Sequence, residues 1–316
     1  MPGIPFEPAS VSLRLYPHNE FAASEVVAEL CAQAKLGLDH GFDGIMTSEH
    51  HGGFPGYLPN PLQMVTFVLE ENAIGWAAAC PLLLPLRPTA LVAEEVAWLS
   101  ARHPGRVGLG VAAGALPRDF DAMGVPFESA VERFKDALPR LVDMLRGRDL
   151  RELQDDPALQ RVAEHPVTVL SAAASTGAAR RAARVGAGLL LEGMSAPDRL
   201  ARLCAAYDES GGVAPKVLIR RVWLGQPDGV LVSRQREVYN GYASTATSFG
   251  GDQTVSAGDP AVLAEMLQTA LRVSGADALN LRVHLPGMSV ADIREQIVVW
   301  GTRCSRGSGR ADGTGL

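Results

Sequence analysis

The chain has 316 residues, of which 47% are hydrophobic and only 6% are aromatic, and its net charge at pH 7 is −6. This length suits one large α/β domain, and an acidic chain without a basic stripe is not a typical nucleic-acid-binding protein. Its first residues lack the basic and apolar segments of a secretory signal, and its longest apolar run, 74–86, is interrupted by Pro81 and Pro85. That run is too short to cross a bilayer. We therefore expect a cytoplasmic protein without a membrane or nucleic-acid partner.

Short aliphatic runs alternate with longer amphipathic stretches along the chain. The first amphipathic stretch shows the pattern clearly, because Val26, Leu30, Ala34 and Leu38 lie four residues apart and form one apolar stripe. Gly41 follows and can end that helix. In chain order, strands are predicted at 11–15, 44–47, 74–80, 107–111, 167–170, 188–191, 217–224 and 278–283, and their helices begin near residues 24, 61, 89, 128, 177, 197, 259 and 289.

Eight strand–helix units predict a parallel sheet with right-handed crossovers. At this length a closed (β/α)₈ barrel is favoured over an open sheet. We predict a single domain over residues 1–303 and a disordered tail over 304–316, which is rich in Gly, Ser and Arg. A long polar segment, 225–258, follows the seventh strand and is predicted to form a lid over the barrel mouth, with one helix near 235–242.

Two histidines and a carboxylate follow the second strand as Glu49-His50-His51. In a parallel barrel the residues after each strand lie at the carboxyl end, where sites are built. Histidine titrates near neutral pH, so these side chains are candidates for acid–base catalysis. They could also be metal ligands, but spacing places no third ligand, and we expect no metal. The alternative is that a histidine only hydrogen-bonds a loop carbonyl.

Small residues follow the fourth and fifth strands. The run from Gly108 to Gly114 lacks bulky side chains, so a flat ring could lie against the strand ends, although close packing of strands explains the run equally well. The run from Ser171 to Gly177 opens a helix with hydroxyls and backbone N–H groups, which form an anion site at many helix starts. An ordinary serine cap is the alternative.

Arginines also stand near the predicted mouth. Arg220 and Arg221 are neighbours on the seventh strand, so at most one points inward, where it could hold a carboxylate or phosphate. A surface ion pair is expected for the other. Arg282 and His284, on the eighth strand, raise the same question.

Several motifs occur in a fixed order between residues 11 and 192. Ser48-Glu49-His50-His51 leads into a glycine-rich loop, and the stretch GRVGLGVAAG at 105–114 is followed by RDFDAMG at 118–124. The stretch 166–191 joins a Ser-Thr turn to an alanine-rich helix. Together they resemble the EHH, GR-x-x-x-G-V-x-x-G, DF-x-x-x-G and flavin-phosphate segments of the bacterial luciferase-like flavin-dependent monooxygenases.

The resemblance implies an oxidoreductase that uses reduced FMN and dioxygen to oxygenate a small organic molecule. A separate NAD(P)H:flavin reductase would supply the reduced FMN, and the family suggests a homodimer. His50 matches the family's catalytic histidine, with Glu49 and His51 beside it, while Ser175, Thr176 and Gly177 match the phosphate turn. The cofactor-binding residues expected are Gly110, Ala112, Ala113, Gly114, Ser171, Ala174, Ser175, Thr176, Gly177 and Arg220.

One departure from the family matters. Luciferases of the alpha type carry a phosphate-anchoring arginine where this chain has Ala113, and the reactive cysteine of some luciferases is Ala112 here. The alanine at 113 implies weaker flavin binding, another anchor such as Arg220 or Arg221, or a different flavin. Two alternatives therefore stay open: a deazaflavin-dependent oxidoreductase that moves hydride, and a non-catalytic flavin-binding partner subunit. The substrate, whether aldehyde, ketone or polyketide-like aromatic, is not specified.

Overall fold

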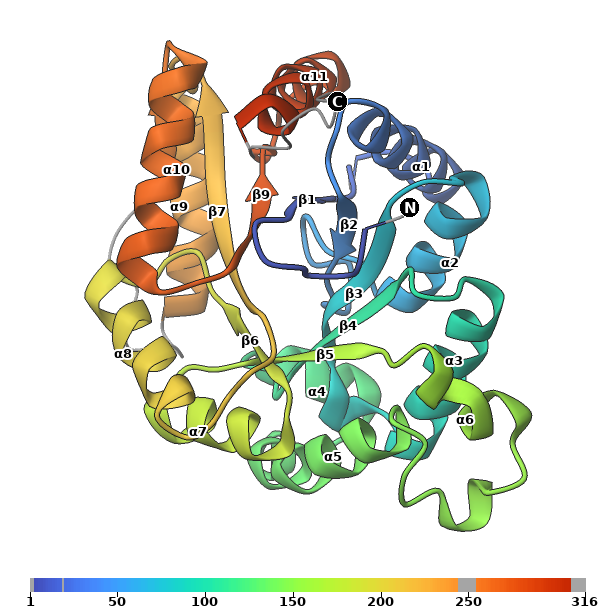
Figure 1. Cartoon of the computed structure of the whole chain (residues 1–316). Coiled ribbons are helices and arrows are strands. Elements are labelled where there is room, and N and C mark those ends of the chain that lie inside the picture. Colours follow the sequence, from blue (N-terminus) through green and yellow to red (C-terminus); the bar gives the residue numbers. More distant parts are fainter. Residues whose placement is uncertain (1–2, 19, 244–253, 308–316) are drawn as a thin grey trace, which may run out of the picture.

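The computed structural model describes residues 3–18, 20–243 and 254–307, and it shows a closed barrel of parallel strands inside a ring of helices (Figure 1). Around the barrel the order is β1-β2-β3-β4-β5-β6-β7-β9, with β9 next to β1 and β6 paired with β7. The predicted (β/α)₈ fold is confirmed. The strands are β1 (Val11–Arg14), β2 (Gly44–Thr47), β3 (Trp76–Leu83), β4 (Val107–Ala112), β5 (Thr168–Ala172), β6 (Gly188–Leu191), β7 (Lys216–Leu224), β8 (Val255–Ala257) and β9 (Ala278–Arg282). The α-helices are α1 (Ala23–Asp39), α2 (Pro61–Glu71), α3 (Thr89–Arg102), α4 (Pro117–Met123), α5 (Ala130–Met144), α6 (Pro157–Arg161), α7 (Thr176–Val185), α8 (Pro197–Asp208), α9 (Gly229–Ala243), α10 (Pro260–Ser274) and α11 (Val290–Gly307).

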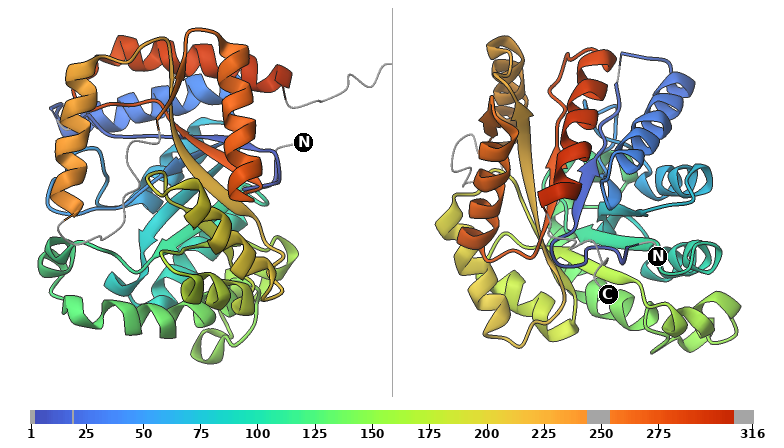
Figure 2. Two further views of the ribbon diagram at one scale, coloured as in Figure 1. Left: turned by 90° about the vertical axis from the view of Figure 1, so that its left-hand side faces the viewer. Right: turned by 45° about the horizontal axis from the view of Figure 1, so that its top comes forward.

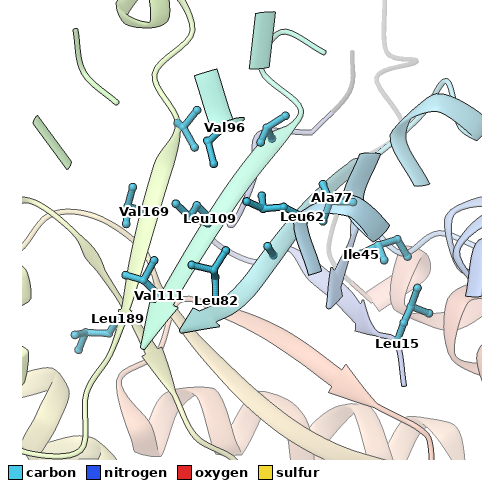
Figure 3. Packing of buried hydrophobic residues seen from close by; sticks show 14 of the residues in the cluster. Leu15, Ile45, Leu62, Ala77, Leu82, Val96, Leu109, Val111, Val169 and Leu189 are labelled. Atoms are coloured by element: carbon cyan, nitrogen blue, oxygen red, sulfur yellow. The ribbon is translucent and has the colours of Figure 1, made fainter. Parts of the chain in front are cut away.

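Successive side chains on each strand point to opposite faces, and both faces of this barrel are buried. The outward side chains form the large core beneath the helices, where Figure 3 shows Leu109 and Val111 of β4 beside Val169 of β5. Each fully buried aliphatic side chain of this kind stabilises the fold by about 1.5–3 kcal/mol. The inward side chains form a second, smaller cluster: Met46, Ala78, Cys80, Leu170, Leu190, Val217 and Ala278.

The amino-terminal end of the barrel is plugged by aromatic rings. Phe6 packs edge-on against Trp76 with ring centroids 5.0 Å apart, and both are buried. Two glycines make room for them: a Cβ on Gly44 would lie 2.1 Å from Trp76, and one on Gly108 would lie 2.7 Å from Phe6. Side chains therefore fill the barrel interior at this end.

Two segments that lie between the predicted strands and helices contain short helices of their own. The segment 112–124 contains α4, which begins at a first-turn proline, Pro117, and ends at Gly124 in the left-handed conformation (φ 67°). The segment 147–165 contains α6 and two 3₁₀ turns. In a sequence, Gly and Pro are typical of loops. In these two segments they stand instead at the ends of short helices. The third strand also runs to Leu83, beyond the predicted end at residue 80.

An excursion leaves the barrel at the end of β7 and returns to the same strand. It carries α9, and its last part forms β8, which pairs in parallel with Val222 to Leu224. The N–H of Gly225 donates to the carbonyl of Ala257 at 2.8 Å, so the two ends of the excursion meet. In the side view of Figure 2, α9 stands apart from α10. Residues 244–253 of the predicted lid lie outside the described residues.

The last helix, α11, continues past Trp300 to Gly307, and residues 308–316 of the predicted tail lie outside the described residues. Within the described ranges, no helix combines the length and the apolar character that a membrane crossing needs.

Candidate active site

A cavity of about 390 Å³ opens at the carboxyl ends of the strands. The segment after β2 and the segment after β5 both line it, so the predicted catalytic and phosphate-binding segments share one rim. The lining residues are Arg14, Tyr16, Ser48, Glu49, His50, Tyr57, Pro81, Leu83, Ala112, Ala113, Gly114, Ala115, Ala172, Ala173, Ala174, Leu190, Glu192, Gly193, Met194, Ile219, Arg221, Thr254 and Arg282.

His50 lies at this rim and forms a pair with Asp119 of α4. Its Nδ1 lies 2.7 Å from Oδ2 of Asp119, a carboxylate that is fully buried. The other oxygen of Asp119 accepts the backbone N–H of His51 at 2.9 Å. Tyr57 packs edge-on against the His50 ring at 4.4 Å between centroids. The carboxylate therefore fixes both the tautomer and the orientation of the ring, with the proton on Nδ1.

Glu49 is fully engaged with the protein itself. Its Oε1 lies 2.6 Å from Nη1 of Arg87 and 2.7 Å from Nε2 of His51, and its Oε2 accepts the N–H of Leu83 at 2.6 Å. The same segment is joined to residue 58 by backbone hydrogen bonds, including His50 N–H to the carbonyl of Leu58 at 3.1 Å. Glu49 and His51 thus hold the loop that presents His50, and Glu49 also lines the cavity. Within the described ranges no three metal-binding side chains gather.

Small residues line the cavity over three neighbouring strands. They are called the small-residue arc here: Ala112 to Ala115, which begin at the last residue of β4, Ala172 to Ala174 at the end of β5, and Gly193 after β6. The expected residues Ala112, Ala113, Gly114 and Ala174 belong to it. Gly110 does not, because it packs against Cys80, where an added Cβ would lie 2.0 Å from the sulfur.

The start of α7 borders this arc. Ser175 is its N-cap, with Oγ accepting the N–H of Ala178 at 3.2 Å. Thr176 and Gly177 form the first turn of the helix, while Ser171 is buried on β5. A guanidinium also lies close by, because Arg199 of α8 donates to the carbonyl of Ala174 at 2.6 Å. The positive end of a helix dipole and an arginine thus meet beside the arc.

Arginines line the opposite wall of the cavity. They are called the arginine arc here: Arg14 of β1, Arg282 of β9 and Arg221 of β7, three strands that are neighbours in the barrel. The prediction of Arg220 as a ligand-binding residue is not supported by its position. On β7 the inward series is Val217, Ile219 and Arg221, so Arg220 faces the other way.

Buried Arg220 donates weakly to the carbonyls of Ile219 and Gly193, and burial lowers its pKa although Glu192 opposes the shift. His284 lies next to the arginine arc, stacked on Tyr16 with ring centroids 5.4 Å apart. Burial holds the pKa of His284 well below its ordinary value, and the charges of Arg282, His18 and Arg221 lower it further. This part of the cavity wall therefore carries a positive potential.

The prediction from sequence missed three residues that shape the site: Asp119, Arg14 and Tyr16. Asp119 lies within the motif RDFDAMG at 118–124, but its role depends on α4 folding back over the loop after β2. Arg14 was within a predicted strand, where an arginine among aliphatic residues was a visible signal.

A family model described as luciferase-like monooxygenase matches residues 12–219, which is more than half of the chain. The chain belongs to the luciferase-like monooxygenase family. This membership places it among oxidoreductases. An uncharacterized protein of Mycobacterium tuberculosis is 33% identical over 143 residues, covering 42% of this chain and 49% of that protein. An uncharacterized protein of Sinorhizobium fredii is 25% identical over 239 residues, covering 73% and 67%. The match thus spans about half the length of the mycobacterial relative.

Solved structures of several oxidoreductases share the fold. The monooxygenase RslO1 of Streptomyces bottropensis superposes with a TM-score of 0.77 at 17% identity, over 92% of this chain and 97% of that one. The oxygenating constituent of 3,6-diketocamphane monooxygenase from Pseudomonas putida, solved with FMN, gives 0.72 at 16% identity over 94% and 98%. An F420-dependent secondary alcohol dehydrogenase, solved with an F420–acetone adduct, gives 0.67 at 15% over 93% and 99%.

Proposed function

We propose that this chain is the oxygenase of a two-component system that takes reduced FMN from a separate reductase and uses dioxygen to oxygenate a small organic molecule. One observation carries the proposal: a single cavity is lined both by His50, which is paired with Asp119, and by the small-residue arc, whose last residue on the β5 side, Ala174, directly precedes the N-cap of α7. Family membership supports the reaction class.

The small-residue arc suits a flat ring system. Its methyl groups and bare backbone leave room for a ring to lie against the ends of β4 and β5, and they offer an apolar surface that excludes water. The start of α7 and Arg199 suit the phosphate, because N–H groups and a guanidinium converge there. When bound, reduced FMN supplies the two electrons with which one oxygen atom of dioxygen enters the substrate and the other leaves as water.

The remaining task of the protein is to hold the substrate and to handle protons. With Nδ1 bound to Asp119, Nε2 is the atom through which His50 exchanges a proton with a bound molecule. The buried Asp119 carboxylate holds the imidazole ring in place through Nδ1. Glu49 and Arg87 keep the loop in place while this happens.

A stopped-flow experiment tests the proposal. The protein is mixed with chemically reduced FMN and air, and the flavin absorbance is followed against FMN alone. We expect the protein to change the course of flavin reoxidation, and His50→Ala to alter it in turn. Reoxidation identical to free FMN, together with tight binding of oxidised deazaflavin and none of FMN, would favour the hydride-transferring alternative. Flavin binding that His50→Ala leaves kinetically unchanged would favour a non-catalytic subunit.

A further inference from the structure

Arg14 and Ser48 are neighbours on the inner face of the barrel. Ser12 of β1 points inward, because its Oγ lies 3.3 Å from the sulfur of Met46, a member of the inner cluster. Arg14, two residues after Ser12, points the same way and is aligned with Met46 in the β1–β2 register. Ser48 lies two residues beyond Met46, also on the inner face. Arg14 and Ser48 both line the cavity at the carboxyl end.

A buried hydrogen-bond network holds Arg14 from the side of the inner cluster. Asn280 of β9 accepts the Nε–H of Arg14 through Oδ1 at 2.6 Å, and its Nδ2 donates to Ser12 Oγ at 2.9 Å. Ser12 Oγ in turn donates to the carbonyl of Leu279 at 3.1 Å. Since Ser12 and Asn280 are buried as well, these bonds fix the guanidinium in place without the help of a ligand.

Arg14 and Ser48 each have one buried polar atom that the protein does not satisfy. Arg14 is 4% exposed and Ser48 is 3% exposed. Among the described residues, neither Nη2 of Arg14 nor Oγ of Ser48 has a hydrogen-bond partner. Burying an unpaired donor is costly, so such atoms are usually satisfied by something that the chain itself does not supply. Both atoms can donate, and a single acceptor in the cavity can take a hydrogen bond from each.

A carbonyl oxygen suits this pair better than a carboxylate does. It has two lone pairs and accepts two hydrogen bonds from different directions. A carboxylate matches an arginine best through the edge formed by Nε and Nη2, but Nε of Arg14 already donates to Asn280. Beside Ser48 the cavity is lined by Pro81 and Leu83 of β3, which favour an apolar molecule around the carbonyl group.

We propose that Arg14 and Ser48 together bind a carbonyl oxygen of the organic substrate, which is therefore a ketone, an aldehyde or another carbonyl compound. The inference rests on the proposed function, because it assigns the flavin to the small-residue arc, across the barrel from β1 and β2. His50 follows Ser48 by two residues and lines the same cavity. The carbonyl end of the molecule thus lies on the side of the cavity where His50 exchanges protons.

The test compares two probes of nearly the same shape, acetophenone and α-methylstyrene, which carry C=O and C=CH₂ at the same place. Isothermal titration of the intact protein gives their dissociation constants, and the selectivity is the value for α-methylstyrene divided by the value for acetophenone. Ser48→Ala should lower the selectivity about two- to tenfold. Arg14→Met should lower it about ten- to a hundredfold, because hydrogen bonds from charged donors are stronger.

Thr47 provides the matched control. It is adjacent to Ser48 but points the other way, and its Oγ1 donates to the carbonyl of Pro61 at 3.2 Å. Thr47→Val should therefore lower the midpoint of urea unfolding and leave the selectivity within about twofold. Ser48→Ala should do the reverse, since its hydroxyl has no protein partner to lose. Ser48→Ala decides the matter if Arg14→Met does not fold.

No binding of acetophenone by the wild type, or a selectivity that Ser48→Ala leaves unchanged, would overturn the proposal, since solvent alone would then satisfy the two atoms. An unchanged selectivity together with a loss of oxidised-FMN affinity in Ser48→Ala would overturn it too, because the bound oxygen would be a flavin carbonyl. If the selectivity depends on Ser48 but the protein does not bind FMN, the inference stands and the proposed function fails.

Discussion

The small-residue arc and the arginine arc line the same cavity at the carboxyl ends of the strands, yet they present different chemical surfaces to a ligand. The first offers space, methyl groups and backbone, with the start of α7 at its border. The second offers charge, held in place by Asn280, Tyr16, Gln235 and Thr254. A barrel can divide recognition in this way because neighbouring strands deliver their residues to one wall, so shape and charge are set by different strands.

His50 belongs to neither arc, and its removal should have the largest effect. His50→Ala is expected to lower oxygenation of a substrate about 10²–10⁴-fold, because a positioned proton donor or acceptor is lost. Asp119→Asn should lower it by a smaller factor, since the ring remains but its tautomer is no longer fixed. Rates are measured by product formation under saturating reduced FMN. His165→Ala, at an exposed histidine, is the control, and an unchanged rate in His50→Ala would remove His50 from the reaction.

Glu49 is adjacent to His50 but should act on stability instead. Glu49→Gln breaks a buried contact with Arg87 and His51, which is expected to lower the free energy of unfolding by about 3 kcal/mol. Urea unfolding measures this loss. Oxygenation by the folded variant should stay within about tenfold of the wild type. If the Glu49→Gln protein were stable but reacted as slowly as His50→Ala, Glu49 would have a catalytic role instead.

Two substitutions at Ala113 should change flavin affinity in opposite directions. Ala113→Leu fills the small-residue arc and should weaken FMN binding by about 1–3 kcal/mol. Ala113→Arg introduces the arginine found in alpha-type luciferases and should strengthen it by about 1.5 kcal/mol through the phosphate. Titration of oxidised FMN by fluorescence checks both, with Ala101→Arg on the exposed surface of α3 as the charge control. Two effects of the same sign would place the flavin elsewhere.

The positive wall can be probed through His284. Its pKa in the folded state lies well below 6.5. Below pH 6.5, His284 is therefore protonated in the unfolded chain but stays neutral in the folded protein. The free energy of unfolding should therefore fall by up to about 1.4 kcal/mol per pH unit as the pH drops below 6.5, until the folded-state pKa is reached. His284→Gln should lose this contribution, as measured by urea unfolding between pH 7.5 and 5. Parallel curves for the two proteins would mean that burial and the neighbouring charges do not keep His284 neutral.

Ser175 should give the smallest change. Ser175→Ala removes an N-cap and is expected to cost about 1 kcal/mol of stability, as should Asp259→Ala at the cap of α10. If the Ser175 hydroxyl also contacts the phosphate, only Ser175→Ala should weaken FMN binding, by about 1 kcal/mol. Equal FMN affinity in both variants would leave Ser175 as a helix cap.

The barrel could be predicted from the sequence because local patterns carry it. Apolar runs and the helix start near residue 259 are predicted correctly, and β2 and β6 begin and end where predicted. Side-chain direction was harder. Glu49, His50 and His51 are consecutive, yet their partners Leu83, Arg87 and Asp119 lie 34 to 69 residues away. No local pattern can show which of three adjacent side chains meets a distant element.

For the arginines too, the sequence shows the side-chain direction only in part. Strand alternation required that Arg220 and Arg221 face opposite sides, and only the closed barrel shows that Arg221 faces the cavity. The convergence of Arg14 with Arg221 and Arg282 depends on β1, β7 and β9 being neighbours across the point where the barrel closes. Residues near the two ends of the chain meet there, and short-range periodicity does not report such a meeting.

Gly225 is hydrogen-bonded to Ala257, and β8 pairs with the end of β7. The stretch between them therefore leaves the barrel and returns to it at the same place. Closing a longer loop between fixed ends costs only about 0.6 kcal/mol per doubling of length. This stretch can therefore be lengthened, shortened or replaced without disturbing the barrel. Gln235 and Thr254, which contact the arginine arc, both belong to it. Changes confined to this stretch can thus alter the contacts made to Arg282 and Arg221 while the barrel stays intact.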